Sequence, residues 1–163
     1  MGKLSFKFGD DQPDIKDLKG CIFTNGCFDI LHRGHIELFK FCREQHPYKQ
    51  VVVGVNSDKS IRELKGPDRP IMLEEDRIAV LLAIRWIDNV VIFDTKSVLP
   101  LIKAAQPLFL IKGGNYSTKP CAVASQIVGQ KFVESYGGKA VTAPMVEGVS
   151  STNIIERINN VNK

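Results

Sequence analysis

The residues best suited to chemistry lie in one short segment, Thr24-Asn25-Gly26-Cys27-Phe28-Asp29-Ile30-Leu31-His32-Arg33-Gly34-His35. Two of the chain's 3 histidines, His32 and His35, stand three residues apart, so at a helix start their rings face the same ligand. Gly34 between them lets a phosphate approach the helix N-terminus, where unpaired amides and the helix dipole favour negative charge. The segment therefore predicts an anion site with two imidazole groups beside it.

The turn before these histidines supports the same interpretation. Gly26 permits a backbone turn that no side chain obstructs, and the amides of Cys27 and Phe28 can then point at an anion. Simpler interpretations stay open, because paired histidines also cap helices and a cysteine in such a turn is more often a buried thiol than a nucleophile. A metal site needs a third ligand, and the spacing supplies none.

The rest of the chain alternates between short apolar runs and amphipathic stretches. The runs predict five strands, at residues 21–26, 51–56, 89–94, 108–114 and 140–146. The stretches predict helices at residues 33–45, around Ile61 and Leu64, at 74–85, 97–105 and 125–136, and after Ser150-Ser151-Thr152. Continuously apolar strands between helices indicate an α/β fold with a doubly wound parallel sheet of five strands, Rossmann-like, with ligands at the carboxyl ends of the strands.

Composition limits the alternatives. A chain of 163 residues with 44% hydrophobic and 25% charged residues fits one globular domain, which we place at residues 21–163 after an extension at residues 1–20. A net charge of +4 without a basic stripe suits a small anion better than nucleic acid. No apolar run reaches membrane-spanning length, no signal peptide is evident and no cysteine pair has CxxC spacing, so we expect a cytoplasmic protein with reduced thiols and no membrane partner.

Five segments also carry a resemblance to a known family. GCFDILHRGH resembles the GxFDxxHxGH signature of the cytidylyltransferase-like nucleotidyltransferases. Within them, the chain from Cys21 onward is similar to the adenylyltransferases that act on D-glycero-β-D-manno-heptose 1-phosphate. TNGCFDILHRGH, VNSDKSIRELKGPDRP, EEDRIAVLLAIRWIDNVV, LIKGGNY and VEGVSSTNIIERI follow the order and spacing of that group.

The resemblance implies a reaction and a set of roles. A phosphate oxygen of a sugar phosphate attacks the α-phosphorus of ATP and pyrophosphate leaves, with Mg²⁺ bridging the phosphates. The residues with catalytic roles are His32, His35 and Lys65. The residues that bind the nucleotide are Asn25, Gly26, Cys27, Phe28, Gly34, Lys112, Gly113, Asn115, Ser150, Ser151 and Thr152. The residues that bind the second substrate are Asp29, Asn56, Asp58, Arg69 and Arg77, and no residue is assigned to a metal.

Several of these residues also have ordinary structural interpretations. Lys65 can be one exposed lysine among many, and the hydroxyls of Ser150-Ser151-Thr152 are a usual helix N-cap. Asn56 and Asp58 can form a turn, and Arg77 can pair with Glu74 or Glu75 instead of a substrate phosphate.

The chain departs from the heptose group at two places. Asn115 stands where that group usually has an aspartate, and the stretch STKPCAVAS at 117–125 differs from the usual polar segment. Met145 and Val146 lie where glycerol 3-phosphate cytidylyltransferases have an arginine, which makes that alternative weaker. A third alternative is a nucleotide-binding protein without catalysis. The resemblance further implies a homodimer, a sugar kinase as a separate partner, and a product used for lipopolysaccharide or another surface glycan.

Overall fold

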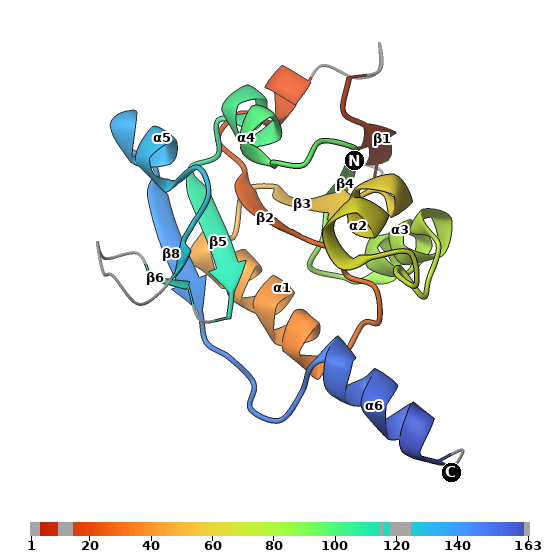
Figure 1. Ribbon diagram of the computed structural model, residues 1–163. Coiled ribbons are helices and arrows are strands. Elements are labelled where there is room, and N and C mark those ends of the chain that lie inside the picture. The colour runs from red at the N-terminus through yellow and green to blue at the C-terminus, as the bar shows by residue number, and fades with distance from the viewer. Residues whose placement is uncertain (1–3, 10–14, 115, 118–124, 162–163) are drawn as a thin grey trace.

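A computed structural model describes residues 4–9, 15–114, 116–117 and 125–161 of the chain. Its main sheet has six parallel strands in the order β1-β4-β3-β2-β5-β8 (Figure 1). The bounds are β1 Leu4–Lys7, β2 Ile22–Gly26, β3 Val51–Asn56, β4 Asn89–Phe93, β5 Phe109–Gly113 and β8 Lys139–Ala143. The α/β fold with a doubly wound parallel sheet is confirmed, and β2 and β5 flank the point where the strand order reverses.

The predicted number of strands is wrong, because the structure adds β1 at the edge of the sheet. Leu4 to Lys7 pair in parallel with Asn89 to Ile92 of β4. The segment LSFK is short and mixes polar with apolar residues, so it lacks the continuous apolar run by which the other strands were predicted. Its pairing partner is some eighty residues away in the sequence, and local patterns carry no information about such a contact.

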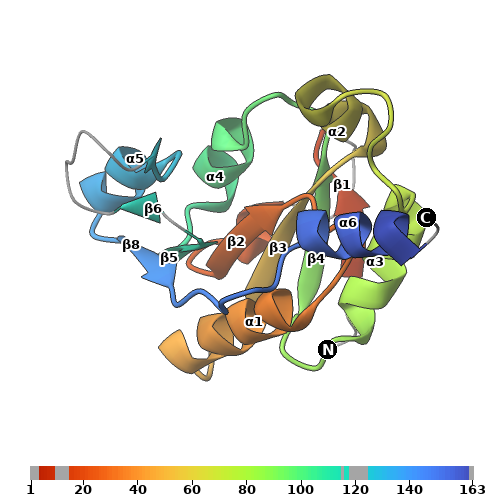
Figure 2. The ribbon, with the colours of Figure 1, turned by 60° about the horizontal axis from the view of Figure 1, so that its bottom comes forward.

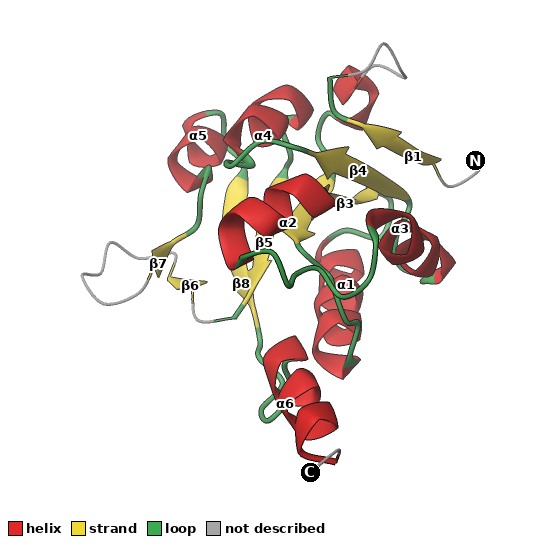
Figure 3. Cartoon of the chain, turned by 45° about the vertical axis from the view of Figure 1, so that its right-hand side comes forward, coloured by secondary structure: helices red, strands yellow, loops and turns green. Residues whose placement is uncertain are grey.

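Helices cover both faces of this sheet, as Figure 2 shows. One core lies between the sheet and α4 Leu99–Ala105, α5 Gln130–Ser135 and the 3₁₀ helix Ile15–Leu18; the other lies under α1 Arg33–Gln45 and α3 Glu74–Ala83. Neighbouring strand residues such as Ile22 and Phe23 therefore pack into opposite cores, and both are fully buried. Figure 3 separates the helices, strands and loops of the same chain.

The helix predicted at 125–136 is wrong over its first half. Ser125–Gln126 form β7, which pairs with β6 Tyr116–Ser117 in a small second sheet, and α5 begins only at Gln130. Gly129 explains the late start, because its φ of +88° is left-handed and lies outside helical geometry. A Cβ there would also lie 2.9 Å from the Ile102 side chain, so the tight turn keeps a glycine before the helix.

The two remaining helices lie at the carboxyl ends of the strands. The helix α2 Asp58–Lys65 follows β3, and α6 Ser151–Val161 follows the loop after β8. No residue of α6 is buried, and Figure 1 shows this helix projecting from the body with the C-terminus at its far end. Its N-terminus is the part that lies against the sheet edge, where the site is built.

Candidate nucleotide-binding site

The residues His32-Arg33-Gly34-His35, called here the HxGH segment, form the N-terminus of α1. Hydrogen bonds within this segment hold both histidine rings. The Gly34 amide donates to Nδ1 of His32 at 3.1 Å, and the His32 amide donates to Nδ1 of His35 at 3.4 Å. Because both Nδ1 atoms accept, each neutral ring carries its proton on Nε2. The capping interpretation and the ligand interpretation are thus compatible, since capping uses Nδ1 and leaves the Nε2–H groups as donors.

Burial keeps this pair neutral in the free protein. The two rings stack with centroids 3.8 Å apart, and His35 also contacts the ring of Phe28. Burial, with smaller contributions from His32 and Lys65, lowers the pKa of His35 to about 4, and burial also lowers the pKa of His32. A bound polyphosphate would oppose both effects, because added negative charge favours the imidazolium form.

The turn between β2 and α1 contains a strained residue. Phe28 has a φ of +49°, an uncommon conformation for a bulky side chain that costs on the order of 1–3 kcal/mol. Its ring is 4% exposed and packs on Phe39. A Cβ on Gly26 would lie 3.2 Å from the Phe28 ring, so glycine at this position lets the ring fold beneath the turn.

Two lysines face this turn from other elements. Lys112, near the end of β5, donates to the Asn25 carbonyl at 2.9 Å, and burial lowers its pKa to about 8. Lys65, the last residue of α2, is exposed and lines the same pocket. The two lysines therefore supply cationic groups from two elements, β5 and α2, that are distant in the sequence.

The N-terminus of α6 completes the site. The Asn153 amide donates to Ser150 Oγ at 3.0 Å, which is the predicted cap. Ser151 Oγ donates to the Ile30 carbonyl at 3.1 Å and joins α6 to the loop before α1. The first amides of two helices, α1 and α6, therefore meet at one pocket, which is the arrangement that helix dipoles make favourable for anions.

These groups line a pocket of about 370 Å³, called here the switch-point pocket because it opens between β2 and β5. Its lining is Asn25, Gly26, Cys27, Phe28, His32, Gly34, His35, Leu38, Lys65, Lys112, Gly113, Gly114, Pro144, Met145, Val146, Val149, Ser150, Ser151 and Thr152. This described lining contains two lysines and two histidines but no carboxylate, so its charge favours an anionic ligand.

Every residue predicted for catalysis lies in this pocket, and so does every residue predicted for nucleotide binding except Asn115. Asn115 lies outside the described residues, as does most of the stretch 117–125. Sequence reasoning did not assign the walls formed by Leu38, Pro144 and Val149. The signal available for Pro144 and Val149 was their position after β8, because β8 pairs with β5 and its carboxyl end lies at the same edge of the sheet as the switch point.

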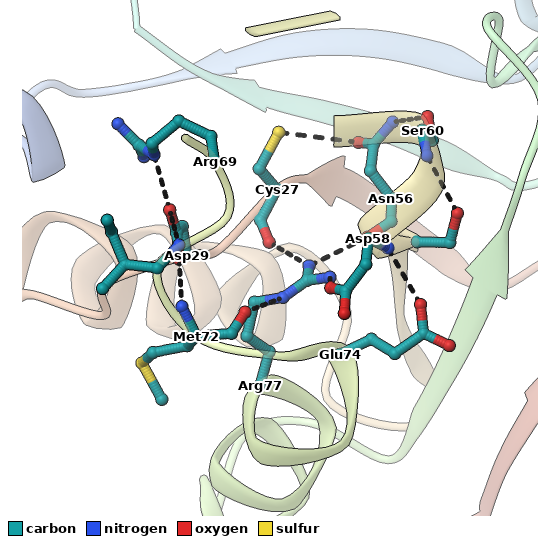
Figure 4. Close-up of polar contacts among 11 residues, drawn as sticks. Cys27, Asp29, Asn56, Asp58, Ser60, Arg69, Met72, Glu74 and Arg77 are labelled. Carbon is teal, nitrogen blue, oxygen red and sulfur yellow. Dashed lines mark hydrogen bonds and ion pairs between the residues drawn. The ribbon is translucent and has the colours of Figure 1, made fainter. Parts of the chain in front are cut away.

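All five residues predicted to bind the second substrate have hydrogen-bond or ion-pair partners within the protein, as Figure 4 shows. Arg77 is fully buried, and its guanidinium donates to the carbonyls of Cys27 at 2.6 Å, Asn56 at 2.9 Å and Met72 at 3.1 Å. It also pairs with Asp58 Oδ1 at 2.8 Å, and not with Glu74 or Glu75. Arg77 with these four partners is called the Arg77 cluster.

Asp29 has a similar internal role. Its carboxylate, 1% exposed, pairs with Arg69 Nε at 2.7 Å and accepts the amides of Ile71 and Met72. Burial raises the pKa of Asp29, but the two amides and Arg69 outweigh burial, so the net pKa is lowered. Asp29 thereby ties the loop after Lys65 to the HxGH segment. Substrate binding by Asp29, Asn56, Asp58, Arg69 and Arg77 stays a prediction.

The described residues do not provide a magnesium site of their own. Mg²⁺ prefers carboxylate and other oxygen ligands, and the described pocket lining has no carboxylate. Among the residues that the structure describes, no group of three or more His, Cys, Asp or Glu side chains has metal-binding geometry. The donor set of the described pocket lining therefore does not fit a resident Mg²⁺. Over the same part of the chain, no helix has the length and apolar character that crossing a membrane requires.

A doubly wound parallel sheet with a cationic pocket at its switch point is the arrangement in which many α/β proteins bind nucleotides. Residues 23–157 match the family described as Cytidylyltransferase-like. This chain belongs to that family, whose members are nucleotidyltransferases, and the HxGH segment and the α6 N-terminus both fall within the matched region.

Curated relatives place the chain more closely. It is 46% identical over 140 residues to the "Bifunctional protein HldE" of Syntrophotalea carbinolica, covering 86% of this chain and 27% of that protein. It is 40% identical over 172 residues to the "Bifunctional protein HldE" of Geobacter sulfurreducens, covering 97% of this chain and 34% of that protein. The chain thus spans about a third or less of the length of these relatives.

Solved structures share the fold at low identity. A lipopolysaccharide core biosynthesis protein from Thermoplasma volcanium superposes with a TM-score of 0.61 at 22% identity, over 78% of this chain and 98% of that one. A pantoate-beta-alanine ligase from Francisella tularensis superposes with a TM-score of 0.55 at 13% identity, over 98% of this chain and 78% of that one. At these identities the likeness concerns the fold alone.

Proposed function

We propose that this chain transfers AMP from ATP to D-glycero-β-D-manno-heptose 1-phosphate, releasing pyrophosphate and forming an ADP-sugar. The observation that carries the proposal is the switch-point pocket, where two Nε2–H imidazoles, two lysines and two helix N-termini meet without an opposing carboxylate. Similarity to the HldE proteins and the family signature support the choice of reaction class.

The chemistry requires one bond to form and one to break. A phosphate oxygen of the sugar phosphate bonds to the α-phosphorus of ATP, and the bond from that phosphorus to the bridging oxygen of pyrophosphate breaks. Negative charge builds on the leaving pyrophosphate, where donors fixed in advance stabilise it. His32, His35 and Lys65 are the proposed donors. No covalent intermediate on the enzyme is needed, because the substrate itself supplies the nucleophile.

Hydrogen bonding prepares the two histidines for this role. Their Nδ1 atoms already accept backbone amides, so the rings cannot turn without losing those hydrogen bonds. Each Nε2–H is therefore held in a fixed direction before the ligand arrives, which removes the cost of orienting it during the reaction. Lys112 fixes the backbone of Asn25 at the floor of the same pocket, and its own ammonium adds positive charge there.

The test is an assay of pyrophosphate release with four substrate pairs. Purified protein is incubated with ATP or CTP, each combined with heptose 1-phosphate or glycerol 3-phosphate, with Mg²⁺ present. We expect turnover with ATP and heptose 1-phosphate. Turnover of CTP with glycerol 3-phosphate alone would establish the cytidylyltransferase alternative. Tight nucleotide binding without pyrophosphate release from any pair would establish a non-catalytic binding protein.

The proposal includes two partners. A sugar kinase has to supply the phosphorylated substrate, and the "bifunctional" description of the HldE proteins supports the pairing of two activities. A homodimer is proposed from the family resemblance, and four apolar side chains on or next to α2 and α3 are exposed in the single chain: Leu64, Ile71, Leu73 and Val80. Light scattering during size-exclusion chromatography would distinguish a monomer of 18.1 kDa from a dimer.

A further inference from the structure

We propose that Arg77 is a positioning residue which orients the amide N–H of Phe28 into the switch-point pocket, as a hydrogen-bond donor to polyphosphate. This inference rests on the proposed function for the identity of the ligand. It assigns to Arg77 a part in the site that needs no contact with substrate, and the Arg77 side chain, fully buried, is not among the residues that line the pocket.

The first step is the direction of one peptide group. The Cys27 carbonyl accepts from Arg77 Nη1 at 2.6 Å (Figure 4), and because Arg77 is fully buried, this oxygen is directed at the buried interior. In a trans peptide the carbonyl and the following N–H point in opposite directions. The Phe28 N–H therefore points away from Arg77. Cys27 and Phe28 both line the pocket, which is the space on that side.

The second step is that this peptide group has no freedom to turn. Phe28 holds a φ of +49°, and its ring is fixed by edge contacts with His35 and packing on Phe39. A strained backbone persists only where surrounding contacts determine it, and such residues gather at ligand sites. Arg77 holds the Cys27–Phe28 peptide group through its carbonyl, and the buried Phe28 ring holds the residue that follows, so the Phe28 N–H keeps one direction.

The third step is that Arg77 is itself fixed. Its other donors go to the Asn56 carbonyl, the Met72 carbonyl and Asp58 Oδ1. These partners belong to the end of β3, the loop before α3 and the first turn of α2. The planar fork of five donors is what lets one side chain hold peptide groups from all these segments, and a lysine ammonium lacks that geometry.

A labelling experiment observes the Phe28 amide directly. Cys27-Phe28 is the only Cys-Phe dipeptide in the sequence, so labelling cysteine with carbonyl ¹³C and phenylalanine with amide ¹⁵N leaves one signal in a carbonyl-to-amide correlation spectrum. The full-length protein is titrated with inorganic pyrophosphate. We expect the Phe28 proton to move downfield in a saturable manner, as a new hydrogen bond to an anion requires. A Phe28 signal that stays unchanged at saturating pyrophosphate overturns the inference.

Two arginine variants separate positioning from stability. Arg77→Lys keeps the positive charge but loses the planar set of guanidinium donors. We expect this variant to reduce the pyrophosphate-induced shift of the Phe28 amide proton and to weaken pyrophosphate binding by about ten-fold to a hundred-fold. Arg43→Lys is the matched control, because Arg43 also donates to two backbone carbonyls, Lys49 and Trp86, and pairs with Asp88, but at the amino-terminal ends of the strands. The control should lose stability and keep both the Phe28 shift and the pyrophosphate affinity.

The positioning role of Arg77 and the proposed transferase activity can fail independently, and the experiments distinguish the two failures. Equal effects of Arg43→Lys and Arg77→Lys on pyrophosphate affinity would overturn positioning and leave Arg77 with a general role in stability. The expected Phe28 shifts without turnover of any substrate pair would support the donor and refute the transferase activity. Turnover with ATP and heptose 1-phosphate without movement of the Phe28 signal would support the transferase activity and refute the Phe28 amide as a donor.

Discussion

Two polar regions lie side by side at the carboxyl edge of the sheet, and they use their polar groups in opposite ways. In the switch-point pocket, His32 and His35 use Nδ1 for backbone hydrogen bonds and carry their protons on Nε2, and Lys65 is exposed. In the Arg77 cluster, a buried guanidinium donates to backbone carbonyls and to Asp58. A polar group that is already paired inside the protein gives up that energy when it binds a ligand, so the pocket is suited to binding and the cluster to support.

Removal of the Arg77 side chain tests whether the Arg77 cluster supports the fold. Arg77→Ala leaves the Asp58 carboxylate without its partner and the Cys27 and Asn56 carbonyls without donors, so we expect a loss of about 3–5 kcal/mol in the free energy of unfolding. Urea unfolding followed by circular dichroism measures it. A loss below about 1 kcal/mol would show that the cluster is not a structural support.

The corresponding test in the pocket is His35→Ala, which should affect turnover more than folding. Loss of one fixed donor to the leaving group lowers kcat by about 10²–10³-fold. His46→Ala is the control, since His46 lies at the C-terminal end of α1, away from the pocket lining. Pyrophosphate release measures both variants, and equal rates for the two would remove the imidazole pair from the mechanism.

Stability should depend on pH through the same histidine. Burial lowers the pKa of His35 to about 4 from an ordinary value of 6.5. Between these values the unfolded chain binds a proton that the folded chain does not, so the free energy of unfolding falls as pH falls from 6.5 toward 4. The loss attributable to His35 is about 2–3 kcal/mol. His35→Gln should flatten this part of the pH profile in urea unfolding, and an unchanged slope would assign the effect to other groups.

The smallest expected effect concerns the attachment of α6 to the pocket. Ser151→Ala removes one hydrogen bond, to the Ile30 carbonyl, and should cost about 0.5–1.5 kcal/mol of stability. Because α6 has no buried residue, we expect hydrogen exchange in α6 to rise more than exchange in α1. Mass spectrometry after deuterium labelling compares exchange in the two helices. Equal changes in α1 and α6 would mean that the Ser151 hydrogen bond does not specifically anchor α6.

The central strands, helix α1 and most of the pocket lining could be predicted from the sequence alone. Buried parallel strands and amphipathic helices leave strong local patterns, and ligands of such sheets gather where the strand order reverses, so Gly26 and Lys112 could be brought together without coordinates. Glycine, histidine and helix-start hydroxyls are also residue types whose chemistry is evident from spacing alone.

The pairing of charged residues with one another, by contrast, follows from the tertiary fold and could not be predicted from the sequence. Arginine and aspartate often bind substrates, and so Arg77 and Asp29 were predicted to do so. Their partners inside the protein come from segments tens of residues away, such as Cys27 for Arg77 and Arg69 for Asp29, and no local pattern reveals them. The edge strand β1 and the left-handed turn at Gly129 depended on distant packing in the same way. A guanidinium or carboxylate is satisfied equally by a ligand or by the protein, and the three-dimensional arrangement of acceptors and donors alone decides between them.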